Sequence, residues 1–376
     1  MTRDSLRNFS YVAINRVLTT ALYGLFWIVI AFILTPDRYG ELTYLVSLAG
    51  IISLISKFGS HYSIVIIEGE GHSNFVRKIN FLVLIISIPS SLTLLVTNPF
   101  AALACMGFSF FAMNQNNLLA VKKYKNFMWN GLTKSILLLT IPITLYYVMG
   151  ISGILLGTAI SDLISSWYYF KSLKFDKPFR TDFRENHKML LHNFAIDLSM
   201  NLPRVADKII IAPLFGFLLV GIYQFNFQIL SALETLPIAL HTYLLPEESS
   251  GQSHKNIIYP MIGVSILLVI IIIFLGPIVV NQFFPKYSEG IVSLQILIIT
   301  LIPLTLASVF SAKLQARKST IVGYSLAVRL ISLLGLIVIL GKWYGLTGLS
   351  MAVLISTVMY TVFLFTVYKL TNSSNK

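Results

Sequence analysis

Five polar residues with helical spacing interrupt an apolar stretch near the middle of the chain. Asn193, Asp197, Asn201, Arg204 and Lys208 follow one another at steps of four, four, three and four residues. In an α-helix this spacing places all five side chains on one face. An arginine on such a face can bind phosphate oxygens with two parallel hydrogen bonds. The stripe predicts a basic cavity wall, a polar seam between helices in which Asp197 and Asp207 neutralise Arg204 and Lys208, or cations that extend to a polar interface.

A second group of polar residues follows about one helix later. Gln224 and Gln228 are four residues apart and share a helix face, and Asn226 lies between them. Amides can donate and accept many weak hydrogen bonds, as sugar hydroxyls require, but they serve equally well in packing between helices. We take all three as candidates to line the path of a sugar.

Two further charged residues, Arg16 and Asp162, lie within apolar stretches, as Asp197 of the stripe does. Arg16 either extends to lipid headgroups or binds a phosphate. Asp162 and Asp197 are candidates for a coupling-ion or proton site, although for Asp162 pairing with a nearby base is the stronger interpretation. An ionisable group in the middle of a bilayer costs about 2.5–3.5 kcal/mol, so such groups tend to face a protein interior or a water-filled cavity. Across all the predicted spans the cations, Arg16, Lys134, Arg204, Lys208 and Arg329, outnumber the carboxylates, so the pattern favours an anionic substrate.

The motifs of common enzyme classes are missing from the sequence. It has no H-x-x-x-H pair, no G-x-x-x-x-G-K-[ST] loop and no G-x-S-x-G turn. Its one cysteine, Cys105, excludes a disulfide within the chain and a cysteine-based zinc site. We therefore expect no enzyme activity, no bound metal and no cofactor.

The composition excludes a soluble globular enzyme. Hydrophobic residues make up 56% of the 376 residues and charged residues 11%, whereas soluble domains are about 25% charged. The net charge of +13 would suggest nucleic acid as the partner of a soluble chain. In an apolar chain it indicates an excess of cations on the cytoplasmic side of a membrane, so we expect no nucleic-acid partner.

Apolar segments of about 20 residues, the length that crosses a bilayer, recur along the whole sequence. We place about twelve spans at residues 10–34, 41–65, 79–97, 98–117, 130–149, 151–170, 189–212, 217–245, 256–280, 291–313, 320–341 and 344–368. With the N-terminus on the cytoplasmic side, only Arg38, Lys286 and Lys342 fall in outer loops, and the other loop cations, Lys57 among them, are cytoplasmic. This bias predicts that both termini are cytoplasmic.

The two halves of the sequence resemble each other. Gly150 and Gly153 are repeated 195 residues later as Gly345 and Gly348, and Lys134 is matched by Arg329. We expect Lys134 and Arg329 to extend to the interface. The repeat predicts an all-α polytopic membrane protein with two pseudo-symmetric six-helix bundles, residues 1–178 and 179–376. Related halves of this kind usually hold the substrate between them.

Three stretches resemble the polysaccharide (O-antigen, Wzx-type) flippases of the multidrug/oligosaccharidyl-lipid/polysaccharide exporter superfamily. Residues 32–60 carry Tyr39-Gly40 and Phe58-Gly59 where the family has a Tyr-Gly turn and a later Phe-Gly. Residues 206–229 are similar to the family's D-x-x-I-x-x-x-x-G-x-x-x-V-G-x-Y signature, and residues 283–297 carry its tyrosine as Tyr287. Pro285 departs from the usual glycine.

The resemblance implies a flippase of the cell (cytoplasmic) membrane that moves a polyprenyl-diphosphate-linked oligosaccharide to the outer leaflet by alternating access, for cell-surface polysaccharide biosynthesis. Its expected partners are the lipid-linked glycan, the bilayer, and polysaccharide polymerases or glycosyltransferases. Arg16, Arg204 and Lys208 are the candidate diphosphate ligands. An alternative is a cation-coupled exporter of small drugs or metabolites from the same superfamily. A glycan polymerase or ligase would need a substantial outer loop, which the sequence lacks.

Overall fold

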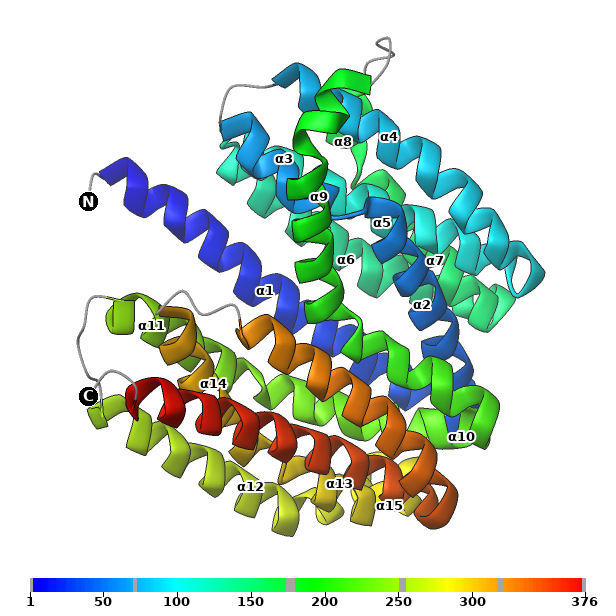
Figure 1. The fold of residues 1–376 in the computed structure, drawn as a ribbon. Helices are drawn as coiled ribbons and strands as arrows, with labels where there is room; N and C mark the ends of the chain where they lie inside the picture. The colour runs from blue at the N-terminus through cyan, green and yellow to red at the C-terminus, as the bar shows by residue number, and fades with distance from the viewer. Residues whose placement is uncertain (1–2, 70–72, 174–179, 250–254, 317–320, 374–376) are drawn as a thin grey trace. The chain divides into compact units, whose positions relative to one another are not determined.

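The protein is helical throughout the part that the computed structural model describes, residues 3–69, 73–173, 180–249, 255–316 and 321–373. Figure 1 shows its helices, and two of them, α10 and α15, contain a sharp break. Their bounds are α1 Arg3–Ile33, α2 Pro36–Lys57, α3 Ser60–Gly69, α4 Ser73–Leu92, α5 Pro99–Ala120, α6 Tyr124–Met149, α7 Ile151–Ile164, α8 Trp167–Ser172, α9 Arg180–Asn201, α10 Pro203–Leu233, α11 Thr235–Ser249, α12 Lys255–Phe283, α13 Ile291–Ile298, α14 Leu301–Ala316 and α15 Ile321–Ser373, with short 3-10 turns η1 Thr93–Val96 and η2 Pro285–Gly290.

Each predicted span consists largely of helix in the described residues, and the lengths suit a membrane. Within the described residues, eight helical stretches are long and apolar enough to cross a bilayer. Two of them, Val205–Leu245 and Tyr324–Thr371, are 41 and 48 residues long, about twice what one crossing needs. Large apolar side chains such as Phe274 and Ile331 are 71% and 72% exposed, as a lipid-facing surface requires. The expected all-α, polytopic architecture of about twelve spans is confirmed.

The chain divides into two compact units. Unit 1 comprises Met1–Ile30 and Tyr44–Val205, and unit 2 comprises Ala31–Thr43 and Ala206–Lys376. These bounds differ from the expected division after residue 178. The reason is that α9 packs on α3 within unit 1, while the tip between α1 and α2 packs within unit 2.

Unit 1 is built around α5, which packs against α3, α4, α7 and α8. Asn98 caps its first turn by accepting hydrogen bonds from the backbone of Phe100 and Ala101, and Pro99 occupies the first helical position. An apolar core lies between α3, α4, α5, α8 and α9, formed by Ile64, Ile67, Phe75, Val76, Ile79, Val83, Phe110, Met113, Tyr169 and Leu190.

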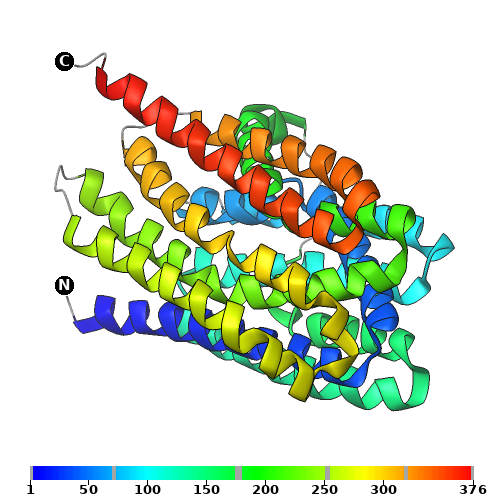
Figure 2. The same ribbon diagram turned by 90° about the horizontal axis from the view of Figure 1, so that it is seen from below.

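Unit 2 is a second bundle in which α14 is central. It packs against α11, α12 and α15, and α12, α14 and α15 run alongside one another in both views (Figures 1 and 2). Apolar side chains fill these contacts: Leu240, Leu244, Ile258, Val309 and Ala312 in one cluster, and Ala307, Leu314, Val322, Tyr360 and Leu364 in another.

The sequence repeat has a structural counterpart in detail. Gly150 ends α6 with φ of 61°, and Gly345 breaks α15 with φ of 56°, a backbone region that favours glycine. Three residues later, Gly153 lies against the carbonyl of Leu145, and Gly348 lies against the carbonyl of Leu340. Both contacts leave no room for a Cβ atom. The same glycine-mediated helix hairpin therefore occurs once in each unit.

Several expected spans are interrupted, and two of the breaks affect the candidate site residues. The segment at 41–65 breaks at Phe58 and Gly59, which have φ of 46° and 69°. The segment at 189–212 breaks between α9 and α10, because Pro203 has no backbone N–H to continue the first helix and instead begins the second. The five-residue stripe is therefore not one helix face: Lys208 lies on α10 in unit 2, and the residues before it lie in unit 1.

Candidate functional site

The first cluster of buried polar groups lies on α9 in unit 1. Asn193 and Asp197 are 7% and 1% exposed. Asn193 Nδ2 donates to Ser63 Oγ at 2.7 Å, and Asn201 Nδ2 donates to Asp197 Oδ1 at 2.7 Å. This side of the stripe therefore faces protein, and its polar groups contact α3 and one another.

The turn between α2 and α3 brings two basic residues to Asp197. Gly59 lies directly against the α9 backbone, where a Cβ atom would overlap Leu190 and Phe194. Phe58 stacks on Phe194 with ring centroids 4.9 Å apart. This close approach fixes the position of the residues on either side of the turn.

Those residues are Lys57 and His61, and both are buried. His61 Nε2 lies 3.6 Å from Asp197 Oδ1, and Lys57 is close enough to interact electrostatically with the same carboxylate. Asp197 Oδ2 makes no hydrogen bond among the described residues. This second carboxylate oxygen can accept a further hydrogen-bond donor or a cation. Leaving it unsatisfied in the protein interior has a free-energy cost.

A second charged pair in unit 1 joins α6 to α7. Lys134 Nζ lies 3.3 Å from Asp162 Oδ1, with the two side chains 14% and 1% exposed. The same ammonium lies over the rings of Phe111 and Tyr23, 5.2 Å and 5.8 Å from their centroids. The expected pairing of Asp162 with a base is confirmed. The expectation that Lys134 extends to the interface is wrong, because the carboxylate and the two rings hold it inside.

Unit 2 retains the cation of this pair but not the carboxylate. The Arg329 guanidinium lies 5.6 Å from the Tyr360 ring centroid, and Thr357 stands at the repeat position of Asp162. The two halves therefore share a hairpin but differ in their buried charge.

The buried carboxylate of unit 2 is Asp207 on α10. Lys208 Nζ donates to its Oδ1 at 2.9 Å, and the Tyr223 hydroxyl donates to its Oδ2 at 2.9 Å. Lys208 is 4% exposed and its ammonium lies 5.2 Å from the Phe227 ring centroid. The predicted neutralisation of Lys208 by Asp207 is confirmed, so this lysine is not an unpaired cation.

The three amide candidates on α10 have different surroundings. Asn226 is buried and donates to the Gly290 carbonyl at 2.9 Å, which gives it a packing role. Gln224 is 8% exposed and its Oε1 makes no hydrogen bond among the described residues. Gln228 is half-buried. Of the three, Gln224 and Gln228 retain polar groups that a ligand could use.

The two arginine candidates belong to unit 1. Arg16 lies on α1 and is exposed, and it makes no ion pair with any residue that the structure describes. Arg204 lies at the start of α10, and its side chain is outside the described residues. Among the residues that the structure describes, no group of three or more His, Cys, Asp or Glu could hold a metal ion.

Sequence reasoning missed Lys57 and His61 as site residues, and it identified Tyr223 only as part of the family signature. Lys57 was assigned to a cytoplasmic loop, yet it is 8% exposed. The available signal was the spacing of Lys57 and His61 around Phe58-Gly59, because a Phe-Gly break with basic residues on both sides indicates a turn inside a span.

Residues from all three stretches that carry the family resemblance meet inside unit 2, whereas Phe58-Gly59 lies in unit 1. Gly40 and Gly221 bring α2 and α10 into backbone contact. Tyr39 packs edge-on against Tyr287, with centroids 6.0 Å apart and planes at 88°. The Asp207–Tyr223 hydrogen bond joins the first and last residues of the D…Y signature. These positions therefore maintain the fold of unit 2.

Solved structures match the chain over nearly its whole length. A lipid II flippase MurJ in an inward closed conformation has a TM-score of 0.77 at 15% identity, covering 95% of this chain and 87% of its own. An inward-facing multidrug resistance MATE family transporter of the MOP superfamily has a TM-score of 0.73 at 15% identity, with 98% of both chains covered. The chain has the fold of the MOP superfamily. A MOP superfamily transporter from Pyrococcus furiosus, described by a reversed polarity of its binding pocket, has a TM-score of 0.58 at 15% identity and covers 98% of this chain and 94% of its own. No protein-family model and no curated protein sequence matches the chain.

Proposed function

We propose that the protein is a flippase of the cytoplasmic membrane that moves a polyprenyl-diphosphate-linked oligosaccharide to the outer leaflet. The observation that carries the proposal is the likeness of 95% of the chain to a lipid II flippase, with a TM-score of 0.77. The Wzx-type sequence features point to the same kind of cargo. Both termini are cytoplasmic in this proposal, and the cycle is alternating access.

The physical task is to carry a large polar head through hydrocarbon while the lipid tail stays in the bilayer. Counter-charge for the diphosphate and amides for the sugars meet this need. Arg16 is our first choice as a phosphate ligand because it is exposed and has no carboxylate partner among the described residues. Arg204 is the second, and Gln224 and Gln228 are proposed to contact the sugars.

The proposal is tested by the leaflet location of the lipid-linked glycan. Cells lacking the protein are complemented with wild type, Arg16→Ala or Lys286→Ala and treated with a membrane-impermeant glycosidase. Lys286 is an exposed cation at the other predicted membrane surface and is the matched control. We expect exposure of the glycan with wild type and Lys286→Ala, and its accumulation inside with Arg16→Ala at equal protein levels.

If the lipid-linked glycan is exposed to the same extent in cells that lack the protein as in cells with wild type, the flippase proposal is wrong. Normal exposure with Arg16→Ala would remove only the assignment of that arginine.

The second candidate is a cation-coupled exporter of small drugs or metabolites. The buried Asp197, with one oxygen free of hydrogen bonds, and the likeness to a MATE transporter favour it. Against it, Lys57 interacts electrostatically with the same carboxylate and disfavours a bound cation. Uptake of ethidium into proteoliposomes, driven by a Na⁺ or proton gradient and lost in Asp197→Asn, would support this candidate instead.

A further inference from the structure

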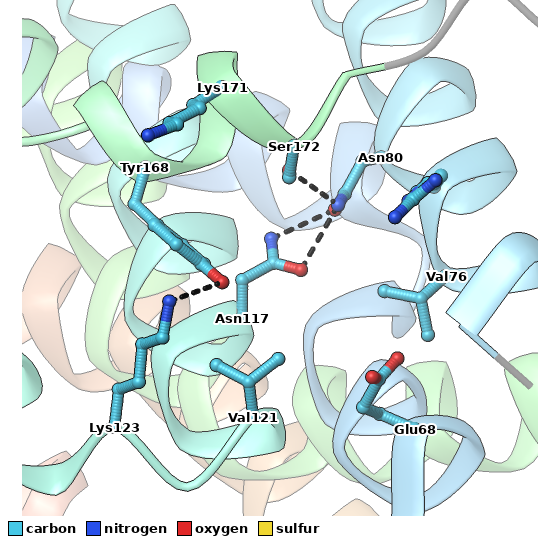
Figure 3. Close-up of a pocket in the computed structure, with 10 residues that line it drawn as sticks. Glu68, Val76, Asn80, Asn117, Val121, Lys123, Tyr168, Lys171 and Ser172 are labelled. Carbon is cyan, nitrogen blue, oxygen red and sulfur yellow. Dashed lines mark hydrogen bonds between the residues drawn. The ribbon is translucent and has the colours of Figure 1, made fainter. Parts of the chain in front are cut away.

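A separate cavity of about 330 Å³ lies in unit 1, away from the charged pairs described above. It is formed where α3, α4, α5 and α8 end or begin, together with the turn that leads into α6. Figure 3 shows its polar side chains converging from these elements.

The charge of the cavity is positive. Arg77, Lys123 and Lys171 line it, and Glu68 is its one carboxylate. Lys123 and Lys171 are exposed and Arg77 is half-buried, so the cations stand at the opening. With three cations and one anion, the cavity has a formal excess of two positive charges. It therefore suits an anionic group.

The floor of the cavity is held by a closed set of hydrogen bonds. Asn80 and Asn117 exchange two side-chain hydrogen bonds, each 3.0 Å long. Asn80 Nδ2 also donates to Ser172 Oγ at 3.0 Å, and Tyr169 donates from its hydroxyl to the Asn80 carbonyl at 2.7 Å. These bonds join α4, α5 and α8, so the cavity is built on fixed elements.

One wall is preorganised by an aromatic ring. Lys123 Nζ lies 3.5 Å from the Tyr168 hydroxyl and 4.8 Å from its ring centroid. This contact keeps the ammonium at the opening without neutralising its charge. Val76 and Val121 add apolar surface on the cavity wall, which suits a ligand that carries hydrocarbon beside its charge.

The location suits a lipid headgroup. All the contributing helix ends belong to loops that the cation bias places on the cytoplasmic side, and this orientation is itself part of the proposed function. Basic pockets between membrane helices on that side bind phosphate-containing lipid headgroups.

We propose that this cavity binds a phosphate group, supplied either by an anionic phospholipid of the adjacent leaflet or by a free cytoplasmic phosphate. Arg77, Lys123 and Lys171 contact the phosphate oxygens, and the Tyr168 hydroxyl adds a donor. The site does not include the residues proposed to bind the transported substrate. Its ligand binds unit 1 at the membrane surface and stabilises it there.

The test uses the full-length protein in detergent. Native mass spectrometry measures bound phosphatidylglycerol against phosphatidylcholine, and thermal unfolding is followed with and without inorganic phosphate. The test variant carries Arg77→Gln, Lys123→Gln and Lys171→Gln. The control variant removes three exposed cations of the same predicted side that do not line the cavity, through Lys122→Gln, Lys125→Gln and Lys188→Gln.

We expect wild type and the control variant to bind phosphatidylglycerol in preference to phosphatidylcholine. Each lysine or arginine near a membrane surface contributes roughly fivefold to such binding, so the triple test variant loses on the order of 100-fold. Should the triple variant fail to fold, Lys171→Gln alone is expected to weaken binding about fivefold, because its side chain is exposed.

The two sources of phosphate give different results. Selective phosphatidylglycerol binding that inorganic phosphate does not displace identifies a lipid. Stabilisation of wild type and the control variant, but not of the test variant, by inorganic phosphate alone identifies a free anion. Equal ligand response of wild type and the test variant overturns the proposal. Because every readout is binding or unfolding, failure here is distinguishable from failure of the flippase proposal.

Discussion

The buried pair of Lys134 and Asp162 allows a structural role to be separated from ion coupling. Asp162 is also a candidate coupling-ion or proton site, so its pairing with Lys134 offers a second explanation for its presence. We predict that Asp162→Asn destabilises the protein strongly, because it leaves the ammonium buried without its counter-charge.

The magnitude follows from the geometry. The two charged atoms are 3.3 Å apart, and at an effective dielectric constant of about 20 their attraction is about 5 kcal/mol. Removal of one partner of a buried pair costs about 3–5 kcal/mol. The rings of Phe111 and Tyr23 still face the ammonium in the variant, and each such contact contributes about 0.5–2 kcal/mol. We therefore expect a loss of about 3 kcal/mol.

The assay is a double-mutant cycle. Unfolding is measured for Asp162→Asn, Lys134→Met and the combination, with Lys125→Met, an exposed lysine of the same helix, as control. The double variant is expected to be more stable than Asp162→Asn, since replacement of both members of a buried ion pair is often close to neutral. The control should change stability by less than about 0.5 kcal/mol.

Additive losses in the cycle would refute the reasoning, because they would mean that the two charges do not interact. Transport by the double variant answers the coupling question. Retained transport assigns Asp162 a structural role, and transport lost in a stable double variant assigns it to coupling.

Two further predictions concern a close packing contact and a buried hydrogen bond. Gly153→Ala and Gly348→Ala should each destabilise the protein by about 1–3 kcal/mol or more and by similar amounts, since each glycine lies against a helix carbonyl at the same point of the repeat. Gly335→Ala, where no other described part of the chain would lie within 4 Å of the new Cβ atom, should be neutral or slightly stabilising in the same thermal-unfolding measurement. The reverse order would contradict the packing argument. Tyr223→Phe removes a hydrogen bond to a buried carboxylate and should cost about 1.5–3 kcal/mol. Tyr287→Phe, whose hydroxyl makes no hydrogen bond with any residue that the structure describes, should be nearly neutral. Equal losses in the two variants would show that the bond contributes nothing.

Local patterns in the sequence were sufficient to predict the helices and the internal repeat. Runs of apolar residues report directly on membrane length, and Gly150 and Gly345 mark the same turn in both halves. Neighbours in sequence were also predictable: Lys208 pairs with the adjacent Asp207. Such features depend on spacing along one helix.

The partners of the buried charges were not predictable in the same way. Helical periodicity states which residues share a face, but not which helix covers it. Asp197 was expected to neutralise Arg204, about two helical turns away, or to serve as an ion site. It instead lies beside His61 and Lys57, because the positive φ of Phe58 and Gly59 allows a turn to touch α9. The break before Pro203 likewise ended a stripe that spacing alone had made continuous.

The assignment of residues 31–43 to unit 2 affects how the gene could be divided. A duplication of equal halves would produce two contiguous polypeptides that fold separately. Here a fragment that ends at Val205 would carry the hairpin tip with Gly40, but not Gly221 and the α10 backbone on which that tip packs. The complementary fragment would lack the same tip. Coexpressed, the two pieces should therefore associate as a split protein, with the first fragment donating its helical tip to the second.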